Sequence, residues 1–175
     1  MRYRFLIDTY ATERLKVVSV WSFFHDTDLA TRPHPTDNRG RSVLEQFIHQ
    51  CVSEGNWFKN FLAIDVGAPP LPETQDRRSF ITRYWQDSGQ RLEALQLKDE
   101  AFWEQEVSFF DTPRSRAWIL VRRVAHTAHH RGQQMAMLRM LNREIRSNYG
   151  PTADTGDKVV YAYPDIDTLL ANLKD

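Results

Sequence analysis

The feature that most constrains this chain is a helical pattern over residues 118–145, which also carries a cluster of histidines. Apolar or small residues recur every three or four positions along it: Ala117, Val121, Val124, Ala128, Gly132, Met135, Leu138, Leu141 and Ile145. Spacing of this kind predicts an amphipathic helix. A second face contains His126, His130 and Gln133 together with further apolar residues. Apolar residues on two faces are typical of a helix packed between neighbours.

Half of the six histidines in the chain fall within five positions of this helix. His126 and His130 are four residues apart, so their rings lie on one side of the helix, about 6 Å apart along its axis. Two imidazoles so placed can bind one metal ion at about 2.0–2.1 Å each. His129 could replace His130, but it points about 100° away from it. We therefore favour His126 and His130 as the ligand pair.

A third ligand must come from another helix, and His49 is the histidine that lies on a second strongly predicted helix. Three neutral histidines would leave a divalent ion with open positions for water or substrate, as in catalytic sites. Spacing alone leaves open a pair of half-buried histidines without a metal. His25 and His34 are expected to be ordinary surface or core residues.

The rest of the chain also predicts helices. We expect them over residues 7–24, 42–64 and 77–96, with a capping box in which Ser42 precedes Glu45 by three positions. The long helix should begin at 111–113, where a proline follows Asp-Thr, end near 146 and stop at 150–151. A short helix should cover 165–173, with a helical turn at 26–29 and extended segments at 107–109 and 159–161. Four long helices predict an all-α bundle, with any metal site between facing helices.

Composition narrows the class of protein. The 175 residues suggest one domain, 1–175, and their zero net charge argues against nucleic-acid binding through a basic surface. The single cysteine, Cys51, fits a reducing compartment, and we expect a buried thiol rather than a nucleophile. No apolar run reaches the length of a membrane span, and no secretion signal is visible. We expect a cytoplasmic protein without membrane contact.

Two motifs carry a resemblance to a known family. The run His126-Thr-Ala-His-His-Arg-Gly-Gln133 resembles the late histidine motif of the DinB/YfiT-like superfamily, and Glu45-Gln-Phe-Ile-His49 matches the position of its early histidine. The resemblance covers about residues 10–161. It implies an up-down-down-up four-helix bundle, often a homodimer, in which His49, His126 and His130 bind one divalent metal ion, commonly nickel or zinc.

The resemblance also implies an activity. Related members are S-transferases or isomerases that use low-molecular-weight thiols such as bacillithiol or mycothiol, so we expect a small-molecule substrate and a thiol cofactor. The residues alone support a metal-dependent hydrolase equally well. A non-catalytic bundle held together by its metal stays open, whereas a DNA-damage-related binding role is disfavoured by the neutral charge.

Other residues near these motifs have competing interpretations. A hydrolase needs a general base, and the candidate carboxylates are Glu45, Glu54, Asp154 and Asp157. Glu45 is better explained as the capping-box partner, and no catalytic residue is assigned.

The remaining motif residues are expected to be mostly structural. Arg131 should serve in packing and helix-to-helix hydrogen bonding, and Gly132 should allow close approach of a neighbouring helix. Gln133 could equally support a ligand or pack. Arg122 and Arg123 could face an anionic thiol cofactor, but we expect a solvated face. The large aromatic residues are expected in the core: Trp57, Phe58 and Trp118.

Overall fold

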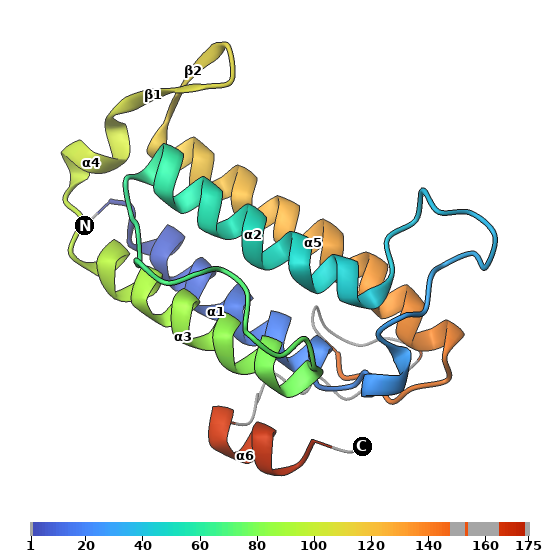
Figure 1. Cartoon of the computed structure of the whole chain (residues 1–175). Coiled ribbons are helices and arrows are strands. Elements are labelled where there is room, and N and C mark those ends of the chain that lie inside the picture. Colours follow the sequence, from blue (N-terminus) through green and yellow to red (C-terminus); the bar gives the residue numbers. More distant parts are fainter. Residues whose placement is uncertain (1, 148–152, 154–164, 174–175) are drawn as a thin grey trace.

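The computed structural model describes residues 2–147, 153 and 165–173, and most of these residues are helical (Figure 1). The long helices are α1 (Arg4–Trp21), α2 (Val43–Leu62), α3 (Arg77–Gln96) and α5 (Arg116–Met140). Shorter elements are the 3-10 helix η1 (Asp26–Asp28), α4 (Glu100–Glu104), β1 (Glu106–Phe109), β2 (Thr112–Ser115) and α6 (Ile166–Ala171).

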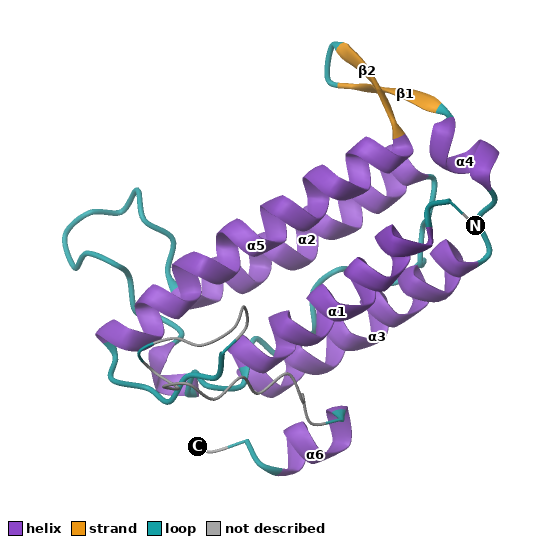
Figure 2. Cartoon of the chain, turned by 180° about the vertical axis from the view of Figure 1, so that it is seen from behind, coloured by secondary structure: helices purple, strands orange, loops and turns teal. Residues whose placement is uncertain are grey.

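The four long helices form the predicted up-down-down-up bundle. Helix α5 packs against α1 and α2, and α3 packs against α1. Figures 1 and 2 show α2 beside α5 in one layer and α1 beside α3 in the other. The connection over residues 63–76 runs back along the bundle, so that α2 and α3 point the same way (Figure 1). An antiparallel hairpin, β1–β2, projects beyond the start of α5.

Side chains that cap the helix N-termini explain where several helices begin. The Ser42 hydroxyl accepts a hydrogen bond from the Glu45 amide, and the Glu45 carboxylate accepts one from the Ser42 amide. This capping box confirms the predicted start of α2. Asp76 and Ser115 cap α3 and α5 in the same position, each accepting from the amide three residues ahead.

The predicted start of α5 at residues 111–113 is wrong. Residues 112–115 instead form strand β2, paired with β1, and the helix begins at Arg116. The predicted extended segment 107–109 is confirmed as part of β1. Phe110 adopts a left-handed conformation between the strands, and Phe109 packs against Trp57 and Phe61. Aromatic packing of the hairpin thus outweighs the helix-start signal that proline gives.

The predicted end of α5 near residue 146 is also wrong, because the helix stops at Met140. Asn142 has a positive φ of 52°, and the amides of Asn142 and Arg143 donate to the carbonyls of Arg139 and Leu138. These two bonds form a Schellman motif in which asparagine takes the usual place of glycine. The Arg143 guanidinium then pairs with the Asp28 carboxylate, which fixes the chain beyond the helix against η1.

The core lies between the two layers of helices and contains polar as well as apolar side chains. The buried apolar residues of α2 are Val43, Phe47, Cys51, Phe58 and Leu62, whereas Leu44 and Ile48 are only partly buried. Polar residues are buried on α2 as well: Gln46, Gln50 and Glu54.

Two aromatic residues that were expected in the core differ in burial. Phe58 is fully buried as predicted, but Trp118 is 39% exposed and so is not a core residue. The turn at 26–29 and a C-terminal helix are confirmed by η1 and α6. Some predictions concern positions outside the described residues, namely 150–151, Asp154, Asp157 and 159–161. Within the described residues, no helix is both long and apolar enough to cross a membrane.

Candidate metal centre

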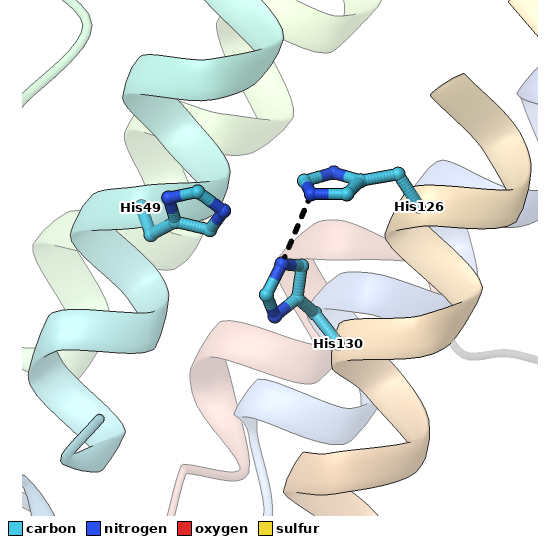
Figure 3. A group of neighbouring side chains, drawn as sticks. All are labelled: His49, His126 and His130. Atoms are coloured by element: carbon cyan, nitrogen blue, oxygen red, sulfur yellow. Dashed lines mark hydrogen bonds between the residues drawn. The ribbon is translucent and has the colours of Figure 1, made fainter. Parts of the chain in front are cut away.

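Three histidines from two helices converge on the outer side of the α2–α5 layer. His49 extends from α2, and His126 and His130 extend from α5 toward it (Figure 3). One ring nitrogen from each histidine lies within 4.8 Å of the other two. The Nε2 atoms of His126 and His130 are 3.2 Å apart. The early histidine and the late pair, far apart in sequence, are thus brought together as predicted.

These distances fit one shared cation. Two imidazole nitrogens bound at about 2.1 Å in tetrahedral or octahedral geometry lie about 3.0–3.4 Å apart. The His126–His130 pair already has that separation. The His49 nitrogen lies within 4.8 Å of the nitrogens of this pair. The donor set has nitrogen ligands only, which suits zinc and nickel.

The surroundings keep all three imidazoles neutral. Burial and the nearby Arg123 guanidinium lower the pKa of His126 to about 3. Burial and the proximity of His49 lower the pKa of His130 to about 4. The pKa of His49 is lowered by burial and by Arg41. A neutral imidazole has a free lone pair, so the rings are ready to bind a cation at neutral pH.

Four hydrogen bonds link five side chains of α5 in one direction. Arg123 lies 3.2 Å from Nδ1 of His126, and a guanidinium can only donate. The Nε2–H of His126 can then donate to Nε2 of His130, whose Nδ1–H donates to Oε1 of Gln133. The Gln133 amide donates to Nε2 of His129 in turn. Neutral rings satisfy every bond in this chain.

A bound cation would affect the hydrogen bonds of His130 and His126 differently. For His130, the bond to Gln133 holds the proton on Nδ1 and leaves Nε2 free, as partners of metal-binding histidines usually do. For His126, binding through Nε2 would place the proton on Nδ1, which faces Arg123. Arg123 would then have to release this ring, and it keeps Ser53 and Thr127 as acceptors when it does so.

Arg123 itself was expected on a solvated face, and that prediction is wrong. Its side chain is 1% exposed, and one of its nitrogens lies 3.7 Å from the Glu54 carboxylate. Glu54 also accepts hydrogen bonds from the Tyr10 and Tyr84 hydroxyls and forms an ion pair with Arg91. We call these five side chains the buried Glu54 network. Burial, aided by the Glu54 charge, raises the pKa of both tyrosines.

This network argues against Glu54 as a general base. Its carboxylate is buried and already accepts from two tyrosines while pairing with arginine. Glu45 is held by the Ser42 amide and by Arg32, which lower its pKa, so it acts as the predicted cap. A sequence signal for the buried polar face did exist: Gln46, Gln50 and Glu54 recur every four residues along α2.

The other motif residues divide between structure and site. Arg131 is fully buried and pairs with Glu13, which confirms its role in packing between α5 and α1. Gly132 is exposed and a Cβ there would meet nothing within 4 Å, so the predicted close helix approach is wrong. Gln133 contacts two histidines, which favours its role as ligand support.

The histidines open into a hollow of about 490 Å³. Its lining consists of Arg41, His49, Arg122, His126, His129 and His130.

Trp57 was expected in the core, but it is half-buried and its ring stacks on His126 with centroids 6.1 Å apart. Cys51 is buried and burial raises its thiol pKa, which agrees with the prediction that it is no nucleophile. The described lining of the hollow thus consists of arginine and histidine side chains, with Trp57 behind His126.

The fold and the cluster together define a class: a four-helix bundle with a three-histidine cluster between an early and a late helix. The DinB family model matches residues 25–156, and the chain belongs to the DinB family. No curated protein matches it.

Solved structures share the fold. A DinB-like protein from Bacillus cereus ATCC 10987 superposes with a TM-score of 0.71 at 16% identity, over 82% of this chain and 95% of that one. A DinB-like protein, YjoA, from Bacillus subtilis gives 0.62 at 16% identity, over 78% and 91%.

Proposed function

We propose that His49, His126 and His130 hold one divalent cation, zinc or nickel, and that the protein is a metal-dependent enzyme acting on a small electrophile. The observation that carries this proposal is the convergence of three neutral imidazoles at the mouth of a hollow. A bound cation would supply Lewis acidity, which lowers the pKa of a thiol or a water molecule and makes it a better nucleophile.

The side chains around the cluster support this chemistry in distinct ways. Gln133 orients His130 and fixes its tautomer. Trp57 forms an aromatic wall beside His126 that can pack against an apolar part of a substrate. The hollow gives a small molecule access to the histidines. With three neutral ligands, the site would keep its full positive charge for a negatively charged nucleophile.

We favour thiol S-transfer over hydrolysis because of the family resemblance. In the described part of the chain, no carboxylate lines the hollow that could serve as a base for activating water. That absence weakens the hydrolase alternative. The open hollow also favours an enzyme over a bundle that is merely held together by metal, since a purely structural site is closed by protein ligands. The thiol's identity, the homodimer and the cytoplasmic location stay predictions.

Metal reconstitution followed by a thiol screen tests the proposal. We expect about one zinc or nickel ion per chain by elemental analysis, and none at high affinity in His126→Ala. His34→Ala, which removes an exposed histidine outside the cluster, is the matched control. Consumption of a low-molecular-weight thiol with an electrophile should require the metal. Reconstituted protein without metal would refute the site, and metal-independent consumption would refute the mechanism.

A further inference from the structure

Two arginines at the hollow, Arg41 and Arg122, form no direct hydrogen bond or ion pair within the described part of the chain, although the Arg41 charge is near enough to Glu45 to lower the pKa of that carboxyl. Arg122 lies on α5, and Arg41 directly precedes the residue that caps α2. Both are exposed and both line the hollow into which the three histidines open. Neither guanidinium forms a hydrogen bond or an ion pair with any residue that the structure describes.

This isolation distinguishes them from the other arginines. Every other arginine has an interaction partner, most often a carboxylate or a carbonyl oxygen, and in some cases an aromatic ring. Pairing of this kind is expected because guanidinium has five donors and no acceptor. The two arginines without partners are found at the same place in the fold, beside the candidate metal centre.

The charge of the hollow is also one-sided. Its described lining contains two arginines and four histidines and no acidic residue. A neighbouring hollow shares Arg41 and His49 and adds Ile48, Val52 and Glu45. The Glu45 carboxylate there is occupied by Arg32 and the Ser42 amide. A ligand would therefore meet two guanidinium groups and no carboxylate near the histidines, and an aliphatic surface along α2.

We propose that Arg41 and Arg122 form an anion subsite that selects small substrates bearing a carboxylate or phosphate group. Arginine binds both groups through paired, charge-assisted hydrogen bonds. An anion held between α5 and the start of α2 would place the rest of the molecule over the histidines or along Ile48 and Val52. The inference rests on the proposed function, because it assigns the substrate class of that site.

Calorimetric titration with succinate and with inorganic phosphate tests the subsite. Succinamide, which has the shape of succinate without its charge, is the control ligand. The proteins are wild type, Arg41→Gln, Arg122→Gln and the double variant, each in metal-free and zinc-loaded form. Arg4→Gln, which removes an exposed arginine paired with Asp8 on α1, is the charge-matched control protein. Elemental analysis of every variant reports the metal content separately.

We expect at least one of the two anions to bind and succinamide not to bind. Each single variant should weaken anion binding by about tenfold or more, as loss of a charge-assisted hydrogen bond does, and Arg4→Gln should not change it. Unchanged affinity in the double variant, or no binding of either anion to zinc-loaded wild type, would overturn the subsite. Absence of metal from the zinc-treated wild type would instead overturn the proposed function. In that case, anion binding to metal-free protein that depends on Arg41 and Arg122 would still support the subsite.

Discussion

Helix α5 has two polar faces that differ in charge: the outer face carries neutral histidines, and the inner face carries buried arginines that lie beside carboxylates. On the outer face, His126 and His130 lie against His49 and are kept neutral by burial and by nearby arginines. On the inner face, Arg123 and Arg131 are fully buried, and their guanidinium groups lie beside the carboxylates of Glu54 and Glu13. The same spacing of three to four residues along one helix produces both faces.

This difference suggests that the inner face serves mainly the stability of the fold and the outer face mainly ligand binding. The inner face is closed: its charges are paired within the protein, and removing one partner leaves an uncompensated buried ion. The outer face is open: its histidines line a hollow, and Arg41 and Arg122 there form no hydrogen bond or ion pair with any described residue. Changes to the inner face should therefore affect folding, whereas changes to the outer face should affect binding.

The largest effect should come from Glu54→Gln in the buried Glu54 network. This change leaves Arg91 and Arg123 buried without their shared carboxylate. We expect the free energy of unfolding to fall by about 3–5 kcal/mol, measured by chemical denaturation. Glu104→Gln removes an exposed carboxylate that pairs with Arg2 and should change it by less than about 0.5 kcal/mol. Equal small changes in both variants would remove the contrast between the two faces.

Metal addition should have the next largest effect, and it should depend on the outer face alone. A zinc concentration of one hundred times the dissociation constant should raise the free energy of unfolding of wild type by about 2.7 kcal/mol. His126→Ala should abolish this gain, and its metal-free form should lose much less stability than Glu54→Gln does. The measurement is denaturation with and without zinc. A collapse of the metal-free His126→Ala fold would show that the outer face is chiefly structural.

Gln133→Leu should weaken metal binding without affecting the fold. Gln133 is exposed and holds the His130 tautomer through Oε1. Loss of such a partner usually lowers metal affinity by about 10–100-fold, which competition with a chelator can measure. Gln96→Leu, at the exposed end of α3, is the control and should leave the affinity unchanged. If Gln133→Leu bound the metal with wild-type affinity, Gln133 would have no role in supporting the His130 ligand.

The smallest effect should be a gain in stability from Gly132→Ala. The glycine is exposed within α5 and an added Cβ meets nothing within 4 Å, so alanine should stabilise the helix by about 0.5–1 kcal/mol. Gly67→Ala is the contrasting control, because its φ of +73° should make alanine destabilising. Thermal unfolding compares the two. If Gly132→Ala instead destabilised the protein, the result would support the close helix packing at Gly132 that the sequence predicted.

What could be predicted from sequence was what depends on local spacing. The four-residue interval between His126 and His130 places both rings on one side of a helix whatever surrounds it. The Ser42–Glu45 capping box is likewise local, and so both predictions agree with the structure. The bundle followed from the number and length of the periodic segments.

The failures concern contacts made between helices. Arg123 looked solvated because its partner, Glu54, is about 70 residues earlier in the chain, and the tyrosines that complete the network come from α1 and α3. Proline at 113 is compatible with a helix start and with an edge strand, and here residue 113 lies in strand β2, whose partner strand contributes Phe109 to the contact with Trp57. Asn142 as the helix terminator was a readable signal that was missed.

Anomalous diffraction at the zinc absorption edge, from crystals of the zinc-loaded protein, is the most direct test of the three-histidine site. We predict one strong peak between α2 and α5, at about 2.0–2.1 Å from a ring nitrogen of each of His49, His126 and His130. A peak bound by only the two histidines of α5, or located at other side chains, would contradict the proposed metal centre.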